Sequence, residues 1–287
     1  MTTAFVLSGG ASLGSIQVGM LKSLEAAGII PDVIVGTSVG AVNGAWIAGE
    51  YSAASLDGLA GLWRSMSRAK VFPADPLTGI AGVLGRRDHL VPPRRFRRLI
   101  REHIKFPDLE LAGIPFHTVS SDVLTGRSVR LSAGPAVDAI AASAAIPGIF
   151  PPVPVGGRLL IDGGAVQNLP IREAVSLGAN TVWVLPTGAS CPISRPPHSA
   201  LEMMLRGLQL ALNAQMAAEI ESCQGLVDLR LVPPLCPVAV NPADFSQAAD
   251  LMRRAEQETA DWLAGEAGFA GQERLLVPHR HPVGGDN

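Results

Sequence analysis

The chain has 287 residues, of which 47% are hydrophobic and 5% aromatic, and its formal net charge is −2. This length suffices for a large buried core, and the apolar, nearly neutral composition argues against disorder and against a dedicated nucleic-acid binder. The N-terminus lacks a basic lead before a long apolar stretch, and no uncharged apolar run reaches the roughly 18 residues that span a bilayer. We therefore expect a cytoplasmic protein, either soluble or peripherally attached to a membrane, with no nucleic-acid partner.

The cysteines give no sign of a metal site. Cys191, Cys223 and Cys236 form no CxxC pair, and an odd number of cysteines suits a reducing compartment. Together with scattered histidines they offer no zinc-binding spacing. We therefore expect no bound metal.

The first fifty residues alternate between strand-like and helix-like patterns. Residues 4–7 form a short apolar run that predicts a buried strand, and apolar residues then recur near helical period from 14 to 27, before Gly28. A second apolar strand at 33–35 leads into a small-residue helix at 41–48. This order predicts an α/β fold in three layers, with a central, largely parallel sheet flanked by helices.

The segment from about 53 to 108 has a different character. Apolar residues at helical spacing, a stretch punctuated by Gly and Pro, and a basic helix predict a mostly helical insertion or lid. Downstream, the patterns predict strands at 114–121, 128–131, 158–161, 182–185 and 227–232, and helices at 135–145, 199–223 and 245–263. We expect one domain over residues 1–277 and a loose C-terminal tail over 278–287.

Ser38 lies in a G-x-S-x-G pentapeptide, Gly36-Thr37-Ser38-Val39-Gly40, between a predicted strand and a predicted helix. A serine on such a turn is held out from the backbone, and the flanking glycines leave room for a substrate. The helix that follows adds its positive N-terminal end, which favours negative charge near the serine oxygen. The motif therefore makes Ser38 a candidate nucleophile.

A second glycine-rich turn, from Ser8 to Gly14, ends the first strand and opens the first helix. Its backbone N–H groups are free to point at one anion. A dinucleotide fingerprint fits poorly because Ala11 replaces the middle glycine, and a Walker A loop would need a lysine that is absent. If the two strands are neighbours, Gly9, Gly10 and Ala11 form an oxyanion hole beside the serine, with the Val39 amide as a further donor.

A nucleophilic serine needs a base. In α/β-hydrolases the base is a histidine late in the chain, but the late histidines here lie in Pro-flanked or terminal segments: His198, His279 and His281. Asp162 follows a predicted strand, and Gly163 and Gly164 keep its surroundings open. Its ordinary alternative is an Asp-Gly turn residue. We predict that Asp162 is the base.

The three motifs, at residues 9–14, 36–40 and 162–164, occur in the order and context of patatin-like phospholipases. Residues 3–50 resemble that family closely, and a looser likeness continues to about Leu185. The resemblance implies a Ser-Asp dyad that hydrolyses acyl esters of lipids or lysolipids, with Ser38 as nucleophile, Asp162 as base and no organic cofactor. Five glycines would support these motifs: Gly14, Gly36, Gly40, Gly163 and Gly164.

The first loop departs from the family pattern at two positions. The family loop commonly has three glycines and an arginine, where this chain has Ala11 and Leu13. Alanine still offers its N–H group, whereas the missing arginine removes a charge that could order the loop or an anionic group. Two other functions stay open. An acyltransferase could use the same serine, because an acceptor other than water can resolve an acyl-enzyme, and Leu13 favours a lipid-binding or regulatory protein with weak turnover.

The segment from Arg86 to Lys105 is strongly basic, with Asp88 and Glu102 as its acidic residues. The helix over Arg94–Arg101 could lie on an anionic membrane and deliver lipid to the site. The alternative, which we favour, is a core-packed helix with a solvated basic face.

Three further features are predicted to be structural. The apolar face of the helix at 199–223 is expected to pack in the core rather than to form an acyl channel, through Met203, Met204, Leu205 and Leu208. His117 and Ser143 are also expected to be structural residues.

Overall fold

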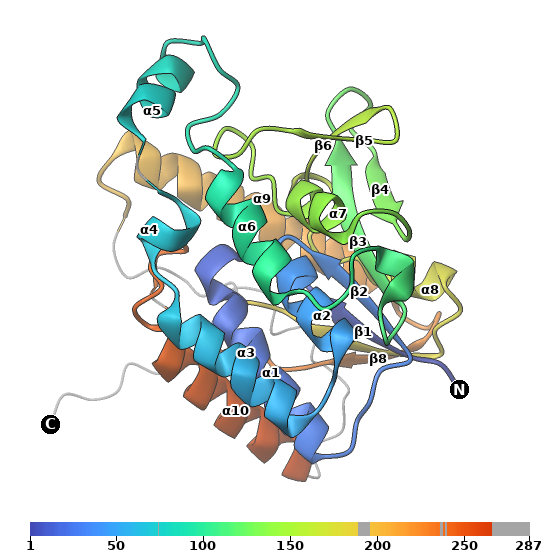
Figure 1. The fold of residues 1–287 in the computed structure, drawn as a ribbon. Helices are drawn as coiled ribbons and strands as arrows, with labels where there is room; N and C mark the ends of the chain where they lie inside the picture. Colours follow the sequence, from blue (N-terminus) through green and yellow to red (C-terminus); the bar gives the residue numbers. More distant parts are fainter. Residues whose placement is uncertain (74, 189–195, 236–237, 239, 266–287) are drawn as a thin grey trace, which may run out of the picture.

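The computed structural model describes residues 1–73, 75–188, 196–235, 238 and 240–265. Its centre is one eight-stranded sheet with helices on both faces (Figure 1). Five adjacent strands are parallel, in the order β3 (Phe116–Asp122), β2 (Val33–Thr37), β1 (Thr3–Leu7), β7 (Thr181–Leu185) and β8 (Asp228–Leu231). Three strands run antiparallel to their neighbours: β4 (Ser128–Leu131), β5 (Val153–Val155) and β6 (Arg158–Asp162). The predicted α/β class is confirmed, although the short strand β5 was not expected.

The helices form two unequal layers. The larger core cluster joins one face of the sheet to α1 (Gly14–Ala26), α2 (Val39–Gly49), α3 (Ala53–Ser65), α6 (Arg94–His103), α7 (Ala136–Ser143) and α10 (Ala248–Ala264). The smaller cluster joins the other face to α8 (Ile171–Ser176) and α9 (Ala200–Cys223). Two short helices, α4 (Arg68–Val71) and α5 (Pro76–Val83), link α3 to α6.

Strand β1 shows why the sheet is buried on both sides. Phe5 and Leu7 belong to the larger cluster, while Ala4 and Val6 belong to the smaller one, and all four are fully buried. Successive side chains of a strand point to opposite faces, so an unbroken apolar run is what a strand covered by helices on both faces requires. The continuous apolar pattern of the sequence is explained in this way.

Strands β2 and β6 meet end to end along one edge of β3. Val119 of β3 pairs with both β2 and β4, and Ser120 pairs with both β4 and β6. Because a strand has two edges, β2 and β6 must share the edge opposite β4. They run in opposite directions, so the C-terminal ends of both strands come together. Ser38, which follows the last residue of β2, therefore lies opposite Asp162, the last residue of β6.

The segment from 53 to 108 is mostly helical, but its parts differ. Helix α3 packs on α1 and α10 and belongs to the main helical layer, whereas α5 projects from the body of the molecule (Figure 1). Movement of this segment as a lid stays a prediction, as does the domain boundary at 277. The tail over 278–287 lies outside the described residues.

The prediction for the apolar residues early in α9 was wrong. Met203, Met204, Leu205 and Leu208 are between 48% and 65% exposed. The helix has 24 residues and is therefore about 36 Å long, whereas the five-residue strands beneath it span only about 17 Å. Its later residues, Met216, Ile220 and Cys223, pack on the sheet, and its first half extends past it. Among the described residues, no helix is long and apolar enough to cross a bilayer.

Candidate active site

Ser38 occupies a strained turn between β2 and α2. Its backbone has φ 55° and ψ −123°, and a positive φ is uncommon for a residue with a side chain. Holding such a conformation costs on the order of 1–3 kcal/mol. The Ser38 N–H donates to Ser143 Oγ at 3.0 Å, and Ser143 in turn donates to the Val119 carbonyl at 2.6 Å. Ser143, predicted to be structural, thus fixes the turn that presents Ser38.

The motif glycines allow close approach of backbone segments. A Cβ atom at Gly36 would clash with the Gly40 carbonyl, and one at Gly40 would clash with the Leu7 carbonyl. A Cβ atom at Gly163 would clash with the Val119 carbonyl, and one at Gly14 with the Val39 side chain. A side chain at any of these positions would displace backbone or side chains that position the serine turn.

Ser38 and Asp162 form a hydrogen-bonded pair. Ser38 Oγ donates to Asp162 Oδ2 at 2.6 Å, while the Gly164 N–H donates to the other carboxylate oxygen at 2.8 Å. Only 7% of Ser38 and 6% of Asp162 is exposed. Burial raises the pKa of Asp162 from 3.8 to about 6, although the hydrogen bonds from Ser38 and Gly164 act in the opposite direction. The carboxylate is therefore a stronger base than an exposed aspartate.

The first glycine loop lies beside Ser38, since a Cβ atom at Gly9 would come within 2.9 Å of Ser38 Cβ. The Gly9 N–H, however, donates to the Asn168 carbonyl at 3.3 Å. The Gly9 N–H is thus engaged in this structure, and its role as an oxyanion donor stays a prediction. Among the described residues, none accepts a hydrogen bond from the N–H groups of Gly10, Ala11 or Val39, which leaves these three as candidate donors.

Ala11 and Leu13 occupy different positions in that loop. Ala11 has φ 52° and lines the pocket beside Ser38. Leu13 packs against the larger core cluster and does not line that pocket. The side chain at the second departure from the family pattern is therefore directed away from the space that a substrate would fill.

A buried polar network holds the loop, and the sequence patterns did not reveal it. Gln17 donates to the carbonyls of Ser8 and Leu185 at 2.9 and 3.0 Å. Asn43 donates to Gln17 Oε1 and to the Gly14 carbonyl, both at 2.9 Å, and accepts from the Trp63 indole at 3.0 Å. These side chains connect the loop to α2 and α3.

Two further residues support the loop from its other side. Thr187 Oγ1 donates to the Gly9 carbonyl at 2.6 Å, and its N–H donates to Ser8 Oγ at 3.0 Å. Asn168 lies against both glycine turns, because a Cβ atom at Gly9 or Gly164 would come within 3.1 Å of its Oδ1. Neither residue belongs to a motif, which is why sequence patterns missed both.

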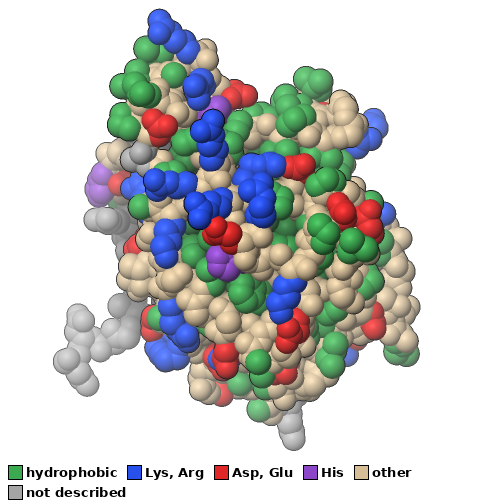
Figure 2. Space-filling model, viewed as in Figure 1, with side chains coloured by type: hydrophobic (Ala, Val, Ile, Leu, Met, Phe, Trp, Pro, Cys, Tyr) green, Lys and Arg blue, Asp and Glu red, His purple; other side chains and the backbone are tan. Residues whose placement is uncertain are grey.

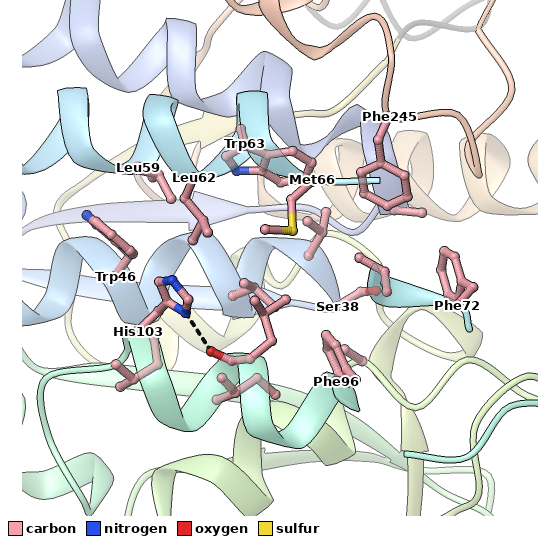
Figure 3. A pocket seen from close by; sticks show the side chains of 18 of the residues that line it. Ser38, Trp46, Leu59, Leu62, Trp63, Met66, Phe72, Phe96, His103 and Phe245 are labelled. Carbon is pink, nitrogen blue, oxygen red and sulfur yellow. Dashed lines mark hydrogen bonds between the residues drawn. The ribbon is translucent and has the colours of Figure 1, made fainter. Parts of the chain in front are cut away.

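A deep apolar pocket begins at Ser38 and runs between α2, α3 and α6 (Figure 3). Its walls come mainly from successive turns of these helices, for example Val42, Leu59, Leu62, Leu99 and Ile100. Phe72 and Phe96 lie at the Ser38 end, whereas Trp46 and His103 lie at the opposite end (Figure 3). The lining is almost wholly hydrocarbon, so the pocket suits an acyl chain better than a polar group.

No described histidine pairs with the serine. His103 lies at the far end of the pocket and is hydrogen-bonded to the Leu99 carbonyl at 2.9 Å. His117 bonds Ser132, and burial lowers its pKa to about 4, in keeping with a structural role. The N–H of His198 donates to Glu202. His279 and His281 lie outside the described residues, as do Cys191 and Cys236. Within the described ranges no cluster of His, Cys, Asp and Glu could hold a metal ion.

The fold and the site together define a class: an α/β protein with a serine at a strand-to-helix elbow, paired with a buried aspartate. The family model "Patatin-like phospholipase" matches residues 5–175, more than half of the chain. The chain belongs to the patatin-like phospholipase family.

Several curated proteins are similar to this chain. Patatin-like phospholipase domain-containing protein 6 of Mus musculus is 32% identical over 191 residues, which make up 66% of this chain but only 14% of that protein. An uncharacterized NTE family protein of Mycobacterium tuberculosis is 29% identical over 266 residues, covering 90% of this chain and 70% of the relative. Lysophospholipase NTE1 of Mycosarcoma maydis is 28% identical over 197 residues, which make up 66% of this chain and 10% of that protein.

Two solved structures are similar to this chain at low sequence identity. VipD from Legionella pneumophila has a TM-score of 0.47 and 11% identity, covering 91% of this chain and 67% of VipD. Human GIVD cytosolic phospholipase A2, in complex with a fluorophosphonate, has a TM-score of 0.45 and 13% identity. The match covers 96% of this chain and 59% of the phospholipase chain.

Proposed function

We propose that this protein is a serine acyl hydrolase that cleaves carboxylic esters of lipids or lysophospholipids through a Ser38–Asp162 dyad and an acyl-enzyme. The observation that carries the proposal is the 2.6 Å hydrogen bond from Ser38 Oγ to Asp162 Oδ2 at one end of an apolar pocket. Membership of the patatin-like phospholipase family and the similarity to a lysophospholipase support the same substrate class.

The first half of the proposed reaction forms the acyl-enzyme. Ser38 Oγ attacks the ester carbonyl carbon, and its proton passes to Asp162 Oδ2. The carbonyl oxygen becomes an oxyanion, which accepts hydrogen bonds from the N–H groups of Gly10, Ala11 and Val39. Each such donor contributes about 3 kcal/mol to stabilisation of the transition state. Cleavage of the C–O bond then releases the alcohol part of the lipid, which takes the proton from Asp162.

The second half regenerates the enzyme. Water gives a proton to Asp162 and attacks the acyl carbon, and the second tetrahedral intermediate collapses to release the fatty acid and the Ser38 alkoxide, which recovers the proton. An alcohol in place of water would give acyl transfer, which is the alternative that uses the same serine. The mechanism uses neither a metal nor an organic cofactor.

The weak-turnover alternative rested on Leu13, and the position of Leu13 favours turnover. Its side chain is partly buried against the larger core cluster and does not line the pocket. The N–H of Ala11, at the other departure from the family pattern, has no hydrogen-bond acceptor among the described residues and is available to an oxyanion. A loop with free donors and an open pocket fits an enzyme better than a protein that only binds lipid.

The test compares ester hydrolysis by wild type, Ser38→Ala and Asp162→Asn, using chromogenic esters of increasing chain length and lysophosphatidylcholine. Either substitution should lower kcat/KM by about 10⁴-fold or more, because each removes an indispensable member of the dyad. Ser65→Ala and Asp57→Asn, at exposed positions of α3, serve as matched controls and should retain full activity. Activity that survives both dyad substitutions contradicts the mechanism.

Two further measurements separate the alternatives. A fluorophosphonate should label wild type at Ser38, as found by mass spectrometry, and should not label Ser38→Ala. The absence of labelling favours a lipid-binding protein without turnover. Ester formation that outpaces hydrolysis when alcohol acceptors are added favours a transferase.

A further inference from the structure

Helix α5 presents its apolar side chains to solvent. Leu77 is 83% exposed, Ile80 59%, Val83 80%, and Leu84, directly after the helix, 62%. The opposite side of α5 packs inward, since Thr78 is only 5% exposed and a Cβ atom at Gly82 would clash with the His89 carbonyl. Surface helices of globular proteins ordinarily turn their apolar side inward. The reversed orientation marks α5 as an interaction surface.

Arginines outnumber the acidic residues beside this apolar helix, of which Asp75 caps its N-terminus and Asp88 follows Arg87. Arg86 and Arg87 lie three and four residues after its end, and α6 adds exposed arginines at 94, 95, 98 and 101. Two arginines of α6 are paired, Arg97 with Asp138 and Arg98 with Glu102. Among the described residues, no ion pair is formed by Arg86, Arg94, Arg95 or Arg101. Figure 2 shows hydrophobic side chains on the projecting α5 end and Lys and Arg side chains gathered over α6.

The same segment is anchored at the pocket. Leu90 and Val91, which follow α5, donate hydrogen bonds to the carbonyls of Gly148 and Ile149 at 3.0 and 2.9 Å. The neighbouring Phe150 lines the pocket, as do Phe72, just before α5, and Phe96 of α6. Phe72 and Phe96 lie at the Ser38 end (Figure 3). The exposed apolar helix therefore projects from the end of the pocket where the ester would lie.

We propose that α5 and the arginines that surround it form a docking surface for an anionic lipid bilayer. The apolar residues Leu77, Ile80, Val83 and Leu84 enter the interface between headgroups and acyl chains, while the unpaired arginines bind lipid phosphates. Charge complementarity favours a bilayer over a second copy of the chain, because two copies would bring their arginines together. The proposal extends the expected role of the Arg94–Arg101 helix to a two-part surface whose apolar part is α5.

Binding is measured independently of catalysis, in the Ser38→Ala background, by co-sedimentation with vesicles. The vesicles are made of phosphatidylcholine alone or of phosphatidylcholine mixed with phosphatidylglycerol. The protein should bind the mixed vesicles, and the binding should weaken as salt is raised. Ile80→Ser combined with Val83→Ser should lower the affinity by about tenfold or more. Arg94→Gln combined with Arg95→Gln should lower it by about fivefold for each arginine removed.

Matched controls use exposed apolar residues elsewhere on the surface. Leu124→Ser and Met204→Ser replace side chains that are 84% and 65% exposed but lie outside α5, and both should bind vesicles as the parent does. In the active enzyme, the α5 double variant should lose hydrolysis of vesicle-borne lipid and keep hydrolysis of a soluble short-chain ester. The latter result separates failure of docking from failure of the proposed chemistry.

Three outcomes overturn the proposal. The first is equal binding to neutral and anionic vesicles by parent and variants, and the second is loss of binding in Met204→Ser but not in the α5 variant. The third is a change of oligomeric state in the α5 variant, measured by analytical ultracentrifugation, with vesicle binding intact. That result would assign the apolar helix to contact with a second copy.

Discussion

In the proposed mechanism, the pKa of Asp162 determines the pH at which the Ser38–Asp162 pair can act. The carboxylate must be ionised to take the proton from Ser38, and burial raises its pKa to about 6. We therefore expect kcat/KM for a soluble ester to be constant above about pH 7 and to fall with decreasing pH, reaching about one tenth of its plateau near pH 5. The measurement is a pH profile of initial rates, with circular dichroism at each pH as a control for unfolding. A profile that stays flat to pH 4.5 is incompatible with Asp162 as the base.

The same shift makes a prediction about stability. A carboxyl whose pKa is raised on folding holds its proton more tightly in the native state than in the unfolded state. Its contribution to the free energy of unfolding is therefore fully favourable below about pH 4 and is lost as pH rises through about 6. Asp162→Asn removes that loss while keeping the shape of the side chain. The variant should therefore be more stable than wild type at pH 8, by roughly 3 kcal/mol for a shift of this size.

Denaturant unfolding at pH 4, 6 and 8 tests this prediction. The difference in the free energy of unfolding between Asp162→Asn and wild type should grow over this range, whereas Asp57→Asn, at an exposed position, should show no such growth. A constant difference would mean that the charge of Asp162 is not costly in the folded state. The gain in stability would accompany a loss of activity, as is common for residues of active sites.

At the residue scale, Ser38 and Asp162 could be found from sequence because each lies in a short glycine-flanked motif after an apolar strand. Gln17 and Asn168 could not, because neither belongs to a motif and each has a hydrogen-bond partner that is distant in sequence, Leu185 for Gln17 and Gln215 for Asn168. One signal was present at Gln17, a polar residue between Ile16 and Val18 in an apolar helix. A buried glutamine must satisfy its amide, so such a position points to a backbone it holds.

At the scale of elements, helix α2 sets the length of the proposed acyl site. Ser38 precedes its first residue and Trp46 lies eight residues further on, a distance of about 12 Å along the axis. Carbon–carbon bonds are about 1.5 Å long and an extended chain zigzags, so this span holds roughly ten carbons. Trp46 is fixed at the end of the pocket by hydrogen bonds from its indole to Ser55 and by stacking on His103. It is placed to limit chain length.

Trp46→Ala should therefore shift the preference of the enzyme toward longer chains. We expect wild type to prefer esters of roughly eight to ten carbons, and the variant to improve the ratio of kcat/KM for long over medium chains by about tenfold. The measurement is a chain-length series of soluble esters below their aggregation limit. Trp262→Ala, which removes a tryptophan of α10 outside the pocket, is the control and should leave the ratio unchanged. An unchanged ratio in Trp46→Ala would mean that Trp46 does not limit the length of the acyl chain that the pocket accepts.

Helix positions were more predictable than helix environments. The sequence pattern located α6 and α9. It also predicted that the early apolar residues of α9 pack in the core, but in the structure they are exposed to solvent. Periodicity identifies an apolar side of a helix and cannot tell whether a sheet lies beneath it. Helix α5 was not predicted as an element, because its residues lie in the stretch that is punctuated by Gly and Pro.

At the scale of the whole molecule, the alternation of strands and helices sufficed to predict the parallel sheet. It did not predict that β2 and β6 share one edge of β3, because that arrangement depends on pairings between residues 82 positions apart for β2 and 38 to 42 positions apart for β6. The juxtaposition of Ser38 and Asp162 follows from this topology. The resemblance of motifs implied that these two residues form a dyad, and the strand pairing is the physical cause of their proximity.

The last part of the chain also contributes to the site, although the family match ends at residue 175. Phe245 lines the pocket, the Pro242 carbonyl accepts the Ser12 N–H at 3.0 Å, and α10 packs along α1, the helix that follows the first glycine loop. The contact between α1 and α10 is close at Gly19, where a Cβ atom would clash with the Met252 carbonyl. Docking of α10 therefore links the C-terminal quarter to the loop beside Ser38.

Gly19→Ala tests this coupling. The added methyl must push α10 away from α1, and such overpacking costs about 1–3 kcal/mol. Gly61→Ala is the matched control, because it adds the same methyl to α3 with nothing within 4 Å and should gain about 0.5–1 kcal/mol from helix propensity. The two alanine variants should thus change the melting temperature in opposite directions, by about 2–4 °C for each kcal/mol. If Gly19→Ala melts no lower than wild type, the tight packing of α10 on α1 is not the contact that holds the C-terminal part against the site.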